Sequence, residues 1–195
     1  LDAYKALNPA GRMPYGLPRL KSKEKLAITN WIDLGAPGPN TFDLERKLIQ
    51  DSGLMHTIQK WEKFFNRDSM KAQLSSRYIY EHLFLASLYF SDNPKFYFRL
   101  TRSLTKSGPI EEVSTSFPFG KANGDFTYRI RPITNTIMHK HHIPFPLNDK
   151  KMAKWDKSFY QSKWNQIPNR MPPYGRAGAN PYKTFASIPA KARYE

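Results

Sequence analysis

The longest helical pattern of the chain covers residues 69–90, SMKAQLSSRYIYEHLFLASLYF, and it constrains the fold more than any other segment. Its second half, from Tyr78 to Phe90, is apolar on nearly all sides, which is typical of an element that is buried on several faces. This half is shorter than the ~20 residues that span a bilayer, and it contains Glu81 and His82. The pattern predicts one central core helix over residues 69–90.

Two segments after Asn93-Pro94 alternate between apolar and polar residues. They are residues 96–101, FYFRLT, and residues 126–131, FTYRIR. A period of two predicts strands, and turn signals at Gly108-Pro109, Gly120 and Asn123-Gly124 separate them. We expect the two strands to pair antiparallel, which gives an α+β chain that is mainly helical with a small antiparallel sheet.

Three further helices are predicted from apolar spacing and breakers. The first lies within residues 42–65, where Gly53 interrupts the pattern; the second covers 134–142 and ends before Pro144; the third covers 149–160. Residues 165–195 are rich in Pro, Gly, Asn and Arg, so we expect a coil-rich tail over the surface.

Residues 12–37, RMPYGLPRLKSKEKLAITNWIDLGAP, combine a Met-Pro loop with one capped amphipathic helix. Ser22 is the predicted N-cap, and Glu24 stands in the first turn, where the helix dipole favours an acid. Ala27, Ile28, Trp31 and Leu34 recur at helical spacing and form one apolar face. Gly35 suits the left-handed position after the helix, and Pro37 prevents its continuation.

This segment resembles the closing part of a c-type cytochrome, in which the Met is a thioether ligand to haem iron. The run GAPGPN over residues 35–40 is a predicted boundary. We therefore expect residues 1–38 to be the C-terminal part of a cytochrome c-like haem unit. Residues 39–195 are expected to form a separate helical region with the two-stranded sheet and the tail.

Charge and cysteine content limit the possible functions. Lys and Arg number 31 against 16 Asp and Glu, for a net charge of +15. Such a balance favours an anionic partner, such as a phospholipid surface, a nucleic acid or an acidic protein, although solubility alone is an alternative explanation. The chain has no cysteine, which excludes disulfides and thiol catalysis.

Three sets of residues are candidates for chemistry. Met13 is a soft, weakly basic ligand that would raise the potential of a His-ligated haem, and packing is the alternative role. His139 and His142, with His141 between them, share a helical face and suit a metal pair, a haem ligand set or a proton relay; a basic surface turn is the alternative.

Glu81 and His82 form the third set. A charged Glu81 inside a buried helix requires a partner, and Arg77, one turn earlier, is the expected one. A buried structural network is the alternative to a functional role. The arginines among the aromatic residues of both predicted strands give only a weak indication of nucleic-acid binding, because the glycine-aromatic signature of such a module is absent.

Four long segments in register resemble the bacterial fatty acid cis/trans isomerase family. They are QLSSRYIYEHLFLASLYF, FYFRLTRS, FTYRIRPITNTIMHKHHIPF and NPYKTFASIPAKARYE, and the Met-Pro segment upstream fits as well. Within the resemblance, Met13 matches the Met of the cytochrome-like loop. His139 and His142 match a His-Lys-x-His pattern, and Glu81 and His82 match a Tyr-Glu-His-Leu run. The last four are catalytic candidates without an assigned role.

The resemblance implies a periplasmic haem c protein that converts cis double bonds of membrane phospholipid acyl chains to trans. Full members carry a signal peptide and a Cys-x-x-Cys-His motif; neither is present, so we expect an internal fragment without covalent haem. The expected partners are unsaturated phospholipids and an anionic membrane surface, and no nucleic acid is expected.

The chemistry suggests that ferric haem transiently withdraws electron density from the alkene, while the protein supplies an apolar slot for the acyl chain and a basic rim for phosphates. Two alternatives remain open: a non-catalytic basic module that binds anionic lipid or nucleic acid, and an electron-transfer cytochrome fragment.

Overall fold

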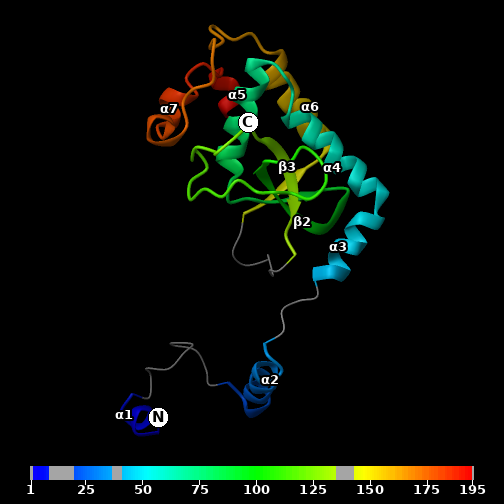
Figure 1. Ribbon diagram of the computed structural model, residues 1–195, viewed down its shortest axis with the longest axis vertical. Helices are drawn as coiled ribbons and strands as arrows, with labels where there is room; N and C mark the ends of the chain where they lie inside the picture. The colour runs from blue at the N-terminus through cyan, green and yellow to red at the C-terminus, as the bar shows by residue number, and fades with distance from the viewer. Residues whose placement is uncertain (1, 9–19, 37–40, 135–142, 195) are drawn as a thin grey trace. The chain divides into compact units, whose positions relative to one another are not determined.

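The computed structural model describes residues 2–8, 20–36, 41–134 and 143–194, and the contacts divide the chain into two units, Leu1–Pro39 and Asn40–Glu195 (Figure 1). The first unit contains helix α1 (Asp2–Leu7) and helix α2 (Ser22–Asp33). No residue of α2 is buried, and Ile28, Trp31 and Leu34 of its predicted apolar face are exposed. The cytochrome c-like character of this unit stays a prediction.

The ends of α2 agree with the sequence at one end and differ at the other. Lys21, not Ser22, is the N-cap, because the Glu24 carboxylate accepts a hydrogen bond of 2.7 Å from the Lys21 backbone N–H. At the other end Gly35 has φ +82°, the left-handed conformation that was predicted. Its N–H donates to the Ile32 carbonyl, which closes the last turn.

The second unit is α+β, as predicted. Its helices are α3 (Thr41–Gln50), α4 (Ser52–Phe65), α5 (Met70–Leu83), α6 (Asp149–Trp155), α7 (Pro181–Thr184) and α8 (Ala190–Arg193), with a π-helical turn η2 (Asp156–Gln161) and a 3₁₀ turn η3 (Gly175–Gly178). Its strands are β1 (Ser87–Phe90), β2 (Asn93–Ser103), β3 (Thr127–Pro132) and β4 (Pro144–Leu147).

The predicted helix over residues 69–90 is wrong in its second half. Helix α5 starts after Ser69, whose hydroxyl accepts from the Ala72 N–H at 3.1 Å, and it ends at Leu83. Residues 87–90 form β1, which lies between β2 and β4 in the sheet. All four residues of β1 are buried or half-buried, so the run does not alternate between apolar and polar residues. A short run of this kind has no period that separates it from a buried helix.

The sheet has the order β3-β2-β1-β4. The predicted antiparallel pairing of β2 with β3 is confirmed, with Leu100 opposite Ile130. Strand β1 adds to the other edge of β2, and β4 then pairs parallel to β1, so the sheet is mixed and larger than the predicted pair. Pro144 and Pro146 are compatible with β4 because it is an edge strand.

Helix α4 covers the opposite edge of the sheet, along β3 (Figure 1). The Asn66 side chain donates to the Tyr128 carbonyl and accepts from the Tyr128 N–H, both at 2.8 Å. The Glu62 carboxylate accepts from the Ile130 N–H at 2.8 Å. The side chains of Asn66 and Glu62 thus bind backbone groups along the edge of β3, where a further strand would otherwise pair. These backbone groups are therefore not open to pairing with another chain.

Two other predicted helices differ in detail. The segment 42–65 forms two helices, α3 and α4. Asp51 is the N-cap of α4, because its carboxylate accepts a hydrogen bond of 2.9 Å from the Leu54 N–H. Helix α4 therefore begins one residue before Gly53. The helix over 149–160 is confirmed, and its last turn widens into the π-helical turn η2. The predicted helix over 134–142 lies almost entirely outside the described residues. The tail, predicted as coil, contains η3, α7 and α8.

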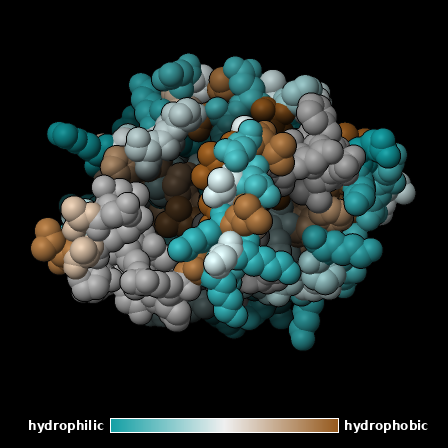
Figure 2. All heavy atoms as spheres, turned by 90° about the horizontal axis from the view of Figure 1, so that it is seen from below, coloured by the Kyte–Doolittle hydropathy of each residue, from teal (hydrophilic) through white to brown (hydrophobic). Residues whose placement is uncertain are grey.

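Aromatic side chains dominate the core of the second unit. Trp61 is fully buried, and its ring makes edge contacts with Phe64 and Trp155 at centroid distances of 5.6 and 5.8 Å. Hydrophobic side chains also remain on the surface, interspersed with hydrophilic ones on the face that Figure 2 draws. No helix of the described residues is long and apolar enough to cross a membrane.

Phe98 gives a direct test of this core, because β2 buries its ring completely against Phe90. We expect Phe98→Ala to lower the free energy of unfolding by about 3–5 kcal/mol through lost burial and the cavity left behind. The matched control is Leu85→Ala, at an exposed position, with an expected change within about 0.5 kcal/mol. Equal losses in a chemical denaturation series contradict this assignment of the core.

Candidate functional site

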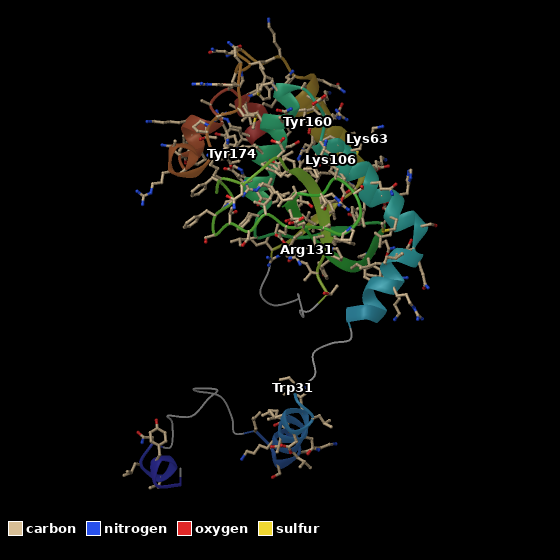
Figure 3. All side chains as sticks on the ribbon, in the orientation of Figure 1. Trp31, Lys63, Lys106, Arg131, Tyr160 and Tyr174 are labelled. Carbon is tan, nitrogen blue, oxygen red and sulfur yellow. The ribbon has the colours of Figure 1, made fainter. Side chains whose placement is uncertain are left out.

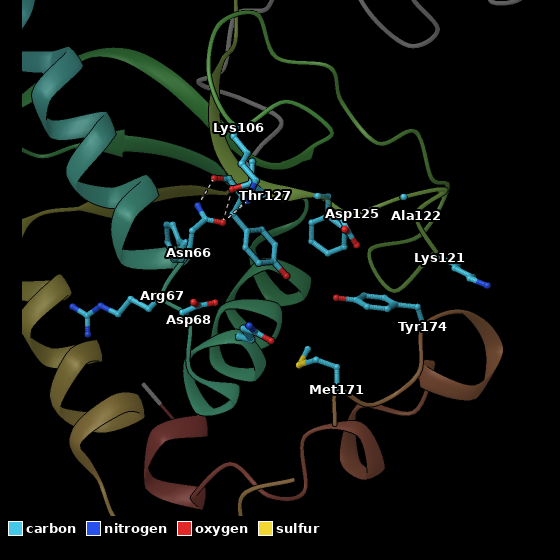
Figure 4. A pocket seen from close by; sticks show the side chains of 15 residues that line it. Asn66, Arg67, Asp68, Lys106, Lys121, Ala122, Asp125, Thr127, Met171 and Tyr174 are labelled. Carbon is cyan, nitrogen blue, oxygen red and sulfur yellow. Dashed lines mark hydrogen bonds between the residues drawn. The ribbon is translucent and has the colours of Figure 1, made fainter. Parts of the chain in front are cut away.

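A cavity of about 680 Å³ opens beside the covered edge of the sheet (Figure 4). It lies between the end of α4, the start of α5, strand β3, the loop from 104 to 126, and the segment around Met171 and Tyr174. Lys106 and Tyr174 therefore reach the same cavity from segments that are far apart in the sequence (Figure 3). A concave site built from several segments is the usual form of a ligand site.

The cavity wall is mainly aromatic. Phe65, Phe126, Tyr128 and Tyr174 line it together with Met171. The Phe126 ring meets the rings of Tyr128 and Tyr174 edge to face, with centroids 5.6 and 6.1 Å apart. Edge contacts of this kind hold large apolar surfaces in fixed orientations, so the wall is preformed.

The two tyrosine hydroxyls of this wall are neutral donors near neutral pH. Burial raises the pKa of Tyr128 well above its ordinary value, because the phenolate would lose its hydration. Burial also raises the pKa of Tyr174, although the nearby arginines oppose the shift. Each of the two hydroxyls also affects the pKa of the other, so the two side chains lie close together. Neither group is a base at neutral pH.

Two fully buried arginines lie behind this wall. Arg102 comes from β2, and it donates to the Gly120 carbonyl at 2.7 Å and to the Thr115 hydroxyl at 2.8 Å. Its guanidinium lies 5.1 Å from the centroid of Phe126 and 5.6 Å from that of Tyr174, while its Nε has no hydrogen-bond partner among the described residues. Cation–π contacts thus offset part of the cost of burying this charge.

Arg77, on α5, connects the helix to the tail. Its Nε donates to the Glu81 carboxylate at 2.7 Å, and its two terminal nitrogens donate to the carbonyls of Pro172 and Pro173 at 2.5 and 3.0 Å. The guanidinium also lies 3.8 Å from the centroid of Tyr174. One side chain therefore holds the part of the tail that forms a wall of the cavity.

Gly178 allows this approach of the tail to Arg77. A Cβ atom at this position would lie 2.1 Å from the Pro173 carbonyl oxygen and 2.8 Å from an Arg77 terminal nitrogen. Neither distance is compatible with a side chain. The last residue of the 3₁₀ turn must be glycine for the tail to lie so close.

Charged side chains surround the cavity, and they differ in how they are paired. Arg67 forms an ion pair with Asp156, and its guanidinium carbon lies 4.6 Å from the centroid of the Tyr160 ring. Its charge is therefore balanced by a carboxylate of the protein. Lys106, Lys121, Asp68 and Asp125 also line the cavity, and none of them forms an ion pair with a described residue.

The structure places the predicted catalytic residues Glu81 and His82 apart from the cavity lining. The expected ion pair of Glu81 with Arg77 is confirmed, and both side chains are buried. Glu81 thus reaches the cavity only through Arg77 and Tyr174. His82 is exposed; its Nδ1 is 2.8 Å from the Tyr78 carbonyl oxygen, and it lines a separate cavity of about 290 Å³.

The remaining predicted site residues lie outside the described residues. They are Met13, the candidate axial ligand, and His139 and His142. The described residues do not fit a haem c site: the chain has no cysteine for covalent attachment, and no group of three or more His, Cys, Asp or Glu among them is suited to a metal ion. A haem c would require residues beyond this set.

Sequence reasoning missed Arg102 and the two tyrosines, although part of the signal was present. Phe98, Leu100 and Arg102 are two residues apart in one strand, so they point to the same buried face. An arginine on that face predicts a buried charge. Nothing in the sequence indicates that Tyr174, from the tail, approaches Tyr128.

Comparison with known proteins identifies the family. A model of the fatty acid cis/trans isomerase family matches residues 1–195. The chain therefore belongs to the fatty acid cis/trans isomerase family, as the resemblance of its segments predicted. No curated protein and no solved structure matches the chain.

The ion pair of Arg77 predicts a large effect for Glu81→Gln. The change leaves a buried guanidinium without its carboxylate, and we expect it to lower the free energy of unfolding by about 3–5 kcal/mol. Glu112→Gln is the matched control, because its pair with Arg131 is partly exposed; we expect a loss of about 0–1 kcal/mol. Similar midpoint shifts in urea for both variants contradict the role assigned to Arg77.

The buried tyrosines predict loss of stability at alkaline pH. Burial raises the pKa of Tyr160 from its ordinary value of 10.0 to about 12, and burial also raises the pKa of Tyr128 well above its ordinary value. Because the unfolded chain ionises first, this stability is complete below pH 10 and is lost as pH rises through about 12. We expect tyrosinate absorbance to rise together with loss of circular dichroism. Ionisation of all 11 tyrosines with the fold intact contradicts this.

Proposed function

We propose that this chain takes part in converting cis double bonds of membrane phospholipid acyl chains to trans. The observation that carries the proposal is the family match over residues 1–195. The cavity supports it, because a phospholipid presents hydrocarbon next to charged head-group atoms, and the cavity combines an aromatic wall with a charged rim. Contact with such a wall removes apolar surface from water, which stabilises the complex by about 25 cal/mol per Å².

Isomerisation changes only the rotation about one C=C bond, so the catalyst must lower a barrier without consuming a second substrate. Each ~1.4 kcal/mol removed from that barrier is a factor of ten in rate. The raised pKa values of Tyr128 and Tyr174 keep both hydroxyls protonated. We therefore assign to the described residues the binding and orientation of the lipid, and to Glu81 the positioning of the wall through Arg77.

The proposal includes a haem c, which would supply electron-withdrawing chemistry when bound, with Met13, outside the described residues, as its candidate ligand. No step is assigned to it, because the described residues offer no site for it. We place the activity in the periplasm at an anionic membrane surface, which the net charge of +15 supports. His82, His139 and His142 stay candidates without a role.

One alternative function has a specific observation in its favour. The surplus of basic residues, 31 against 16 acidic ones, also suits a module that binds anionic lipid without catalysis. Salt-sensitive binding to anionic vesicles without any trans product would favour this alternative.

The experiment uses the natural protein with vesicles of cis-monounsaturated phospholipid and measures trans acyl chains by gas chromatography. Met171→Trp would fill part of the cavity, and we expect the rate of trans formation to fall about tenfold or more, which corresponds to about 1.4 kcal/mol of lost transition-state stabilisation. Leu85→Trp, at an exposed position outside the cavity lining, is the control and should leave the rate unchanged.

An equal rate for Met171→Trp and wild type excludes the cavity from the reaction. The absence of trans product with wild-type protein refutes the proposed function itself. The visible absorption spectrum of the same sample tests the haem, because a colourless protein with full activity removes it from the proposal.

A further inference from the structure

Asp68 and Asp125 are two acids of a basic chain that line the same cavity as Lys106 and Lys121. Asp68 follows α4, Asp125 precedes β3, and both line the 680 Å³ cavity. Neither forms an ion pair with a described residue, whereas five other acids do: Glu62, Glu81, Glu112, Asp149 and Asp156. Both carboxylates are exposed at one cavity, so both are open to a cationic group of a ligand.

Figure 4 shows how these groups lie. The side chains of Asp68 and Asp125 come from different sides of the cavity, and the Tyr174 hydroxyl points into the space between them. Lys106 lies beside Thr127, whereas Lys121 lies at the far side, beyond Asp125 and Tyr174, with its ammonium directed away from them. The cavity thus carries two basic and two acidic groups that no described residue neutralises, around an aromatic wall.

We propose, on the basis of the proposed function, that this cavity binds the zwitterionic head group of a phospholipid, a phosphodiester joined to an ammonium. Lys106 and Lys121 bind the phosphate, and Asp68 and Asp125 bind the ammonium. A head group of this kind satisfies both signs of charge at once. An anionic head group such as phosphoglycerol leaves the two carboxylates facing a phosphate, which disfavours it.

The aromatic wall and the buried arginines behind it favour both the ammonium and the phosphate of the ligand. Aromatic rings attract cations, and the rings of Phe126 and Tyr174 already do so with the guanidiniums of Arg102 and Arg77, at 5.1 and 3.8 Å. Those two guanidiniums face one carboxylate, Glu81, so an excess positive charge lies behind the wall. This charge attracts the phosphate and disfavours an amine that carries no phosphate.

Soluble head-group analogues test the inference by isothermal titration calorimetry on the natural protein. The probes are O-phosphoethanolamine, glycerol 3-phosphate and ethanolamine, at low ionic strength, because salt screens exposed charges. We expect O-phosphoethanolamine to bind about tenfold more tightly than either of the other two. Equal affinity for O-phosphoethanolamine and glycerol 3-phosphate overturns the inference.

Two double variants test the acidic and the basic groups separately. All four side chains are exposed, so we expect both variants to keep the fold, which circular dichroism verifies. Asp68→Asn with Asp125→Asn should abolish the preference for O-phosphoethanolamine over glycerol 3-phosphate. Lys106→Gln with Lys121→Gln should weaken binding of both phosphates about tenfold. The controls Asp92→Asn and Lys95→Gln, at exposed positions outside the cavity lining, should change neither. An unchanged preference in the aspartate variant overturns the inference.

The same variants distinguish this inference from the proposed function. Vesicles of zwitterionic and of anionic cis-monounsaturated phospholipid are compared for trans product. Equal conversion of both, unaffected by the aspartate variant, refutes the head-group site and leaves the isomerase proposal standing. Selective binding of O-phosphoethanolamine without trans product in either vesicle supports the head-group site and refutes the isomerase proposal.

Discussion

The buried guanidinium of Arg77 is the interaction on which the cavity depends. It has no access to water, so each of its donors must find a partner within the protein. Glu81 supplies the charge and accepts from Nε, and the carbonyls of Pro172 and Pro173 accept one bond from each terminal nitrogen. Because those carbonyls belong to the tail, satisfying a charge on α5 also fixes the wall that contains Tyr174. Gly178 is the steric condition for this arrangement.

The opposite wall depends on a second set of polar contacts. Asn66 and Glu62 bind the backbone of β3, which holds the end of α4 against the edge of the sheet. This places Phe65 and Asp68 on one side of the cavity and Tyr128 on another. The cavity thus lies where a helix end, a sheet edge and the tail meet, and hydrogen bonds to backbone groups position all three. Side chains at such a junction keep their orientation, which favours a preformed binding site.

These features support the proposed binding of a phospholipid. The tyrosines of the wall stay neutral because burial raises their pKa values, so they offer hydrogen-bond donors but no negative charge. The charged side chains at the rim are exposed to solvent, whereas those of Arg77 and Arg102 are fully buried. A division of this kind lets the inner residues set the shape of the site while the rim discriminates between head groups.

The sequence predicted those features that depend on local pattern. The α+β class, the pairing of β2 with β3, the left-handed Gly35 and the ion pair of Glu81 with Arg77 all follow from periods, breakers or spacing, and the structure confirms them. Prediction failed at β1, because residues 84–90 have no period, and their state depends on the strands that flank them.

The amino-acid sequence alone determined the family, the excess of basic charge, the absence of cysteine and most helix and strand positions, since each is a property of neighbouring residues or of composition. Only the tertiary structure decided that β1 is a strand between β2 and β4, and that Tyr128 and Tyr174 line one cavity with Arg102 behind them. The physical reason is that a polar group can be buried only where hydrogen-bond or charge partners lie next to it. Here those partners come from segments far apart in the sequence, so no local sequence pattern predicts the contact.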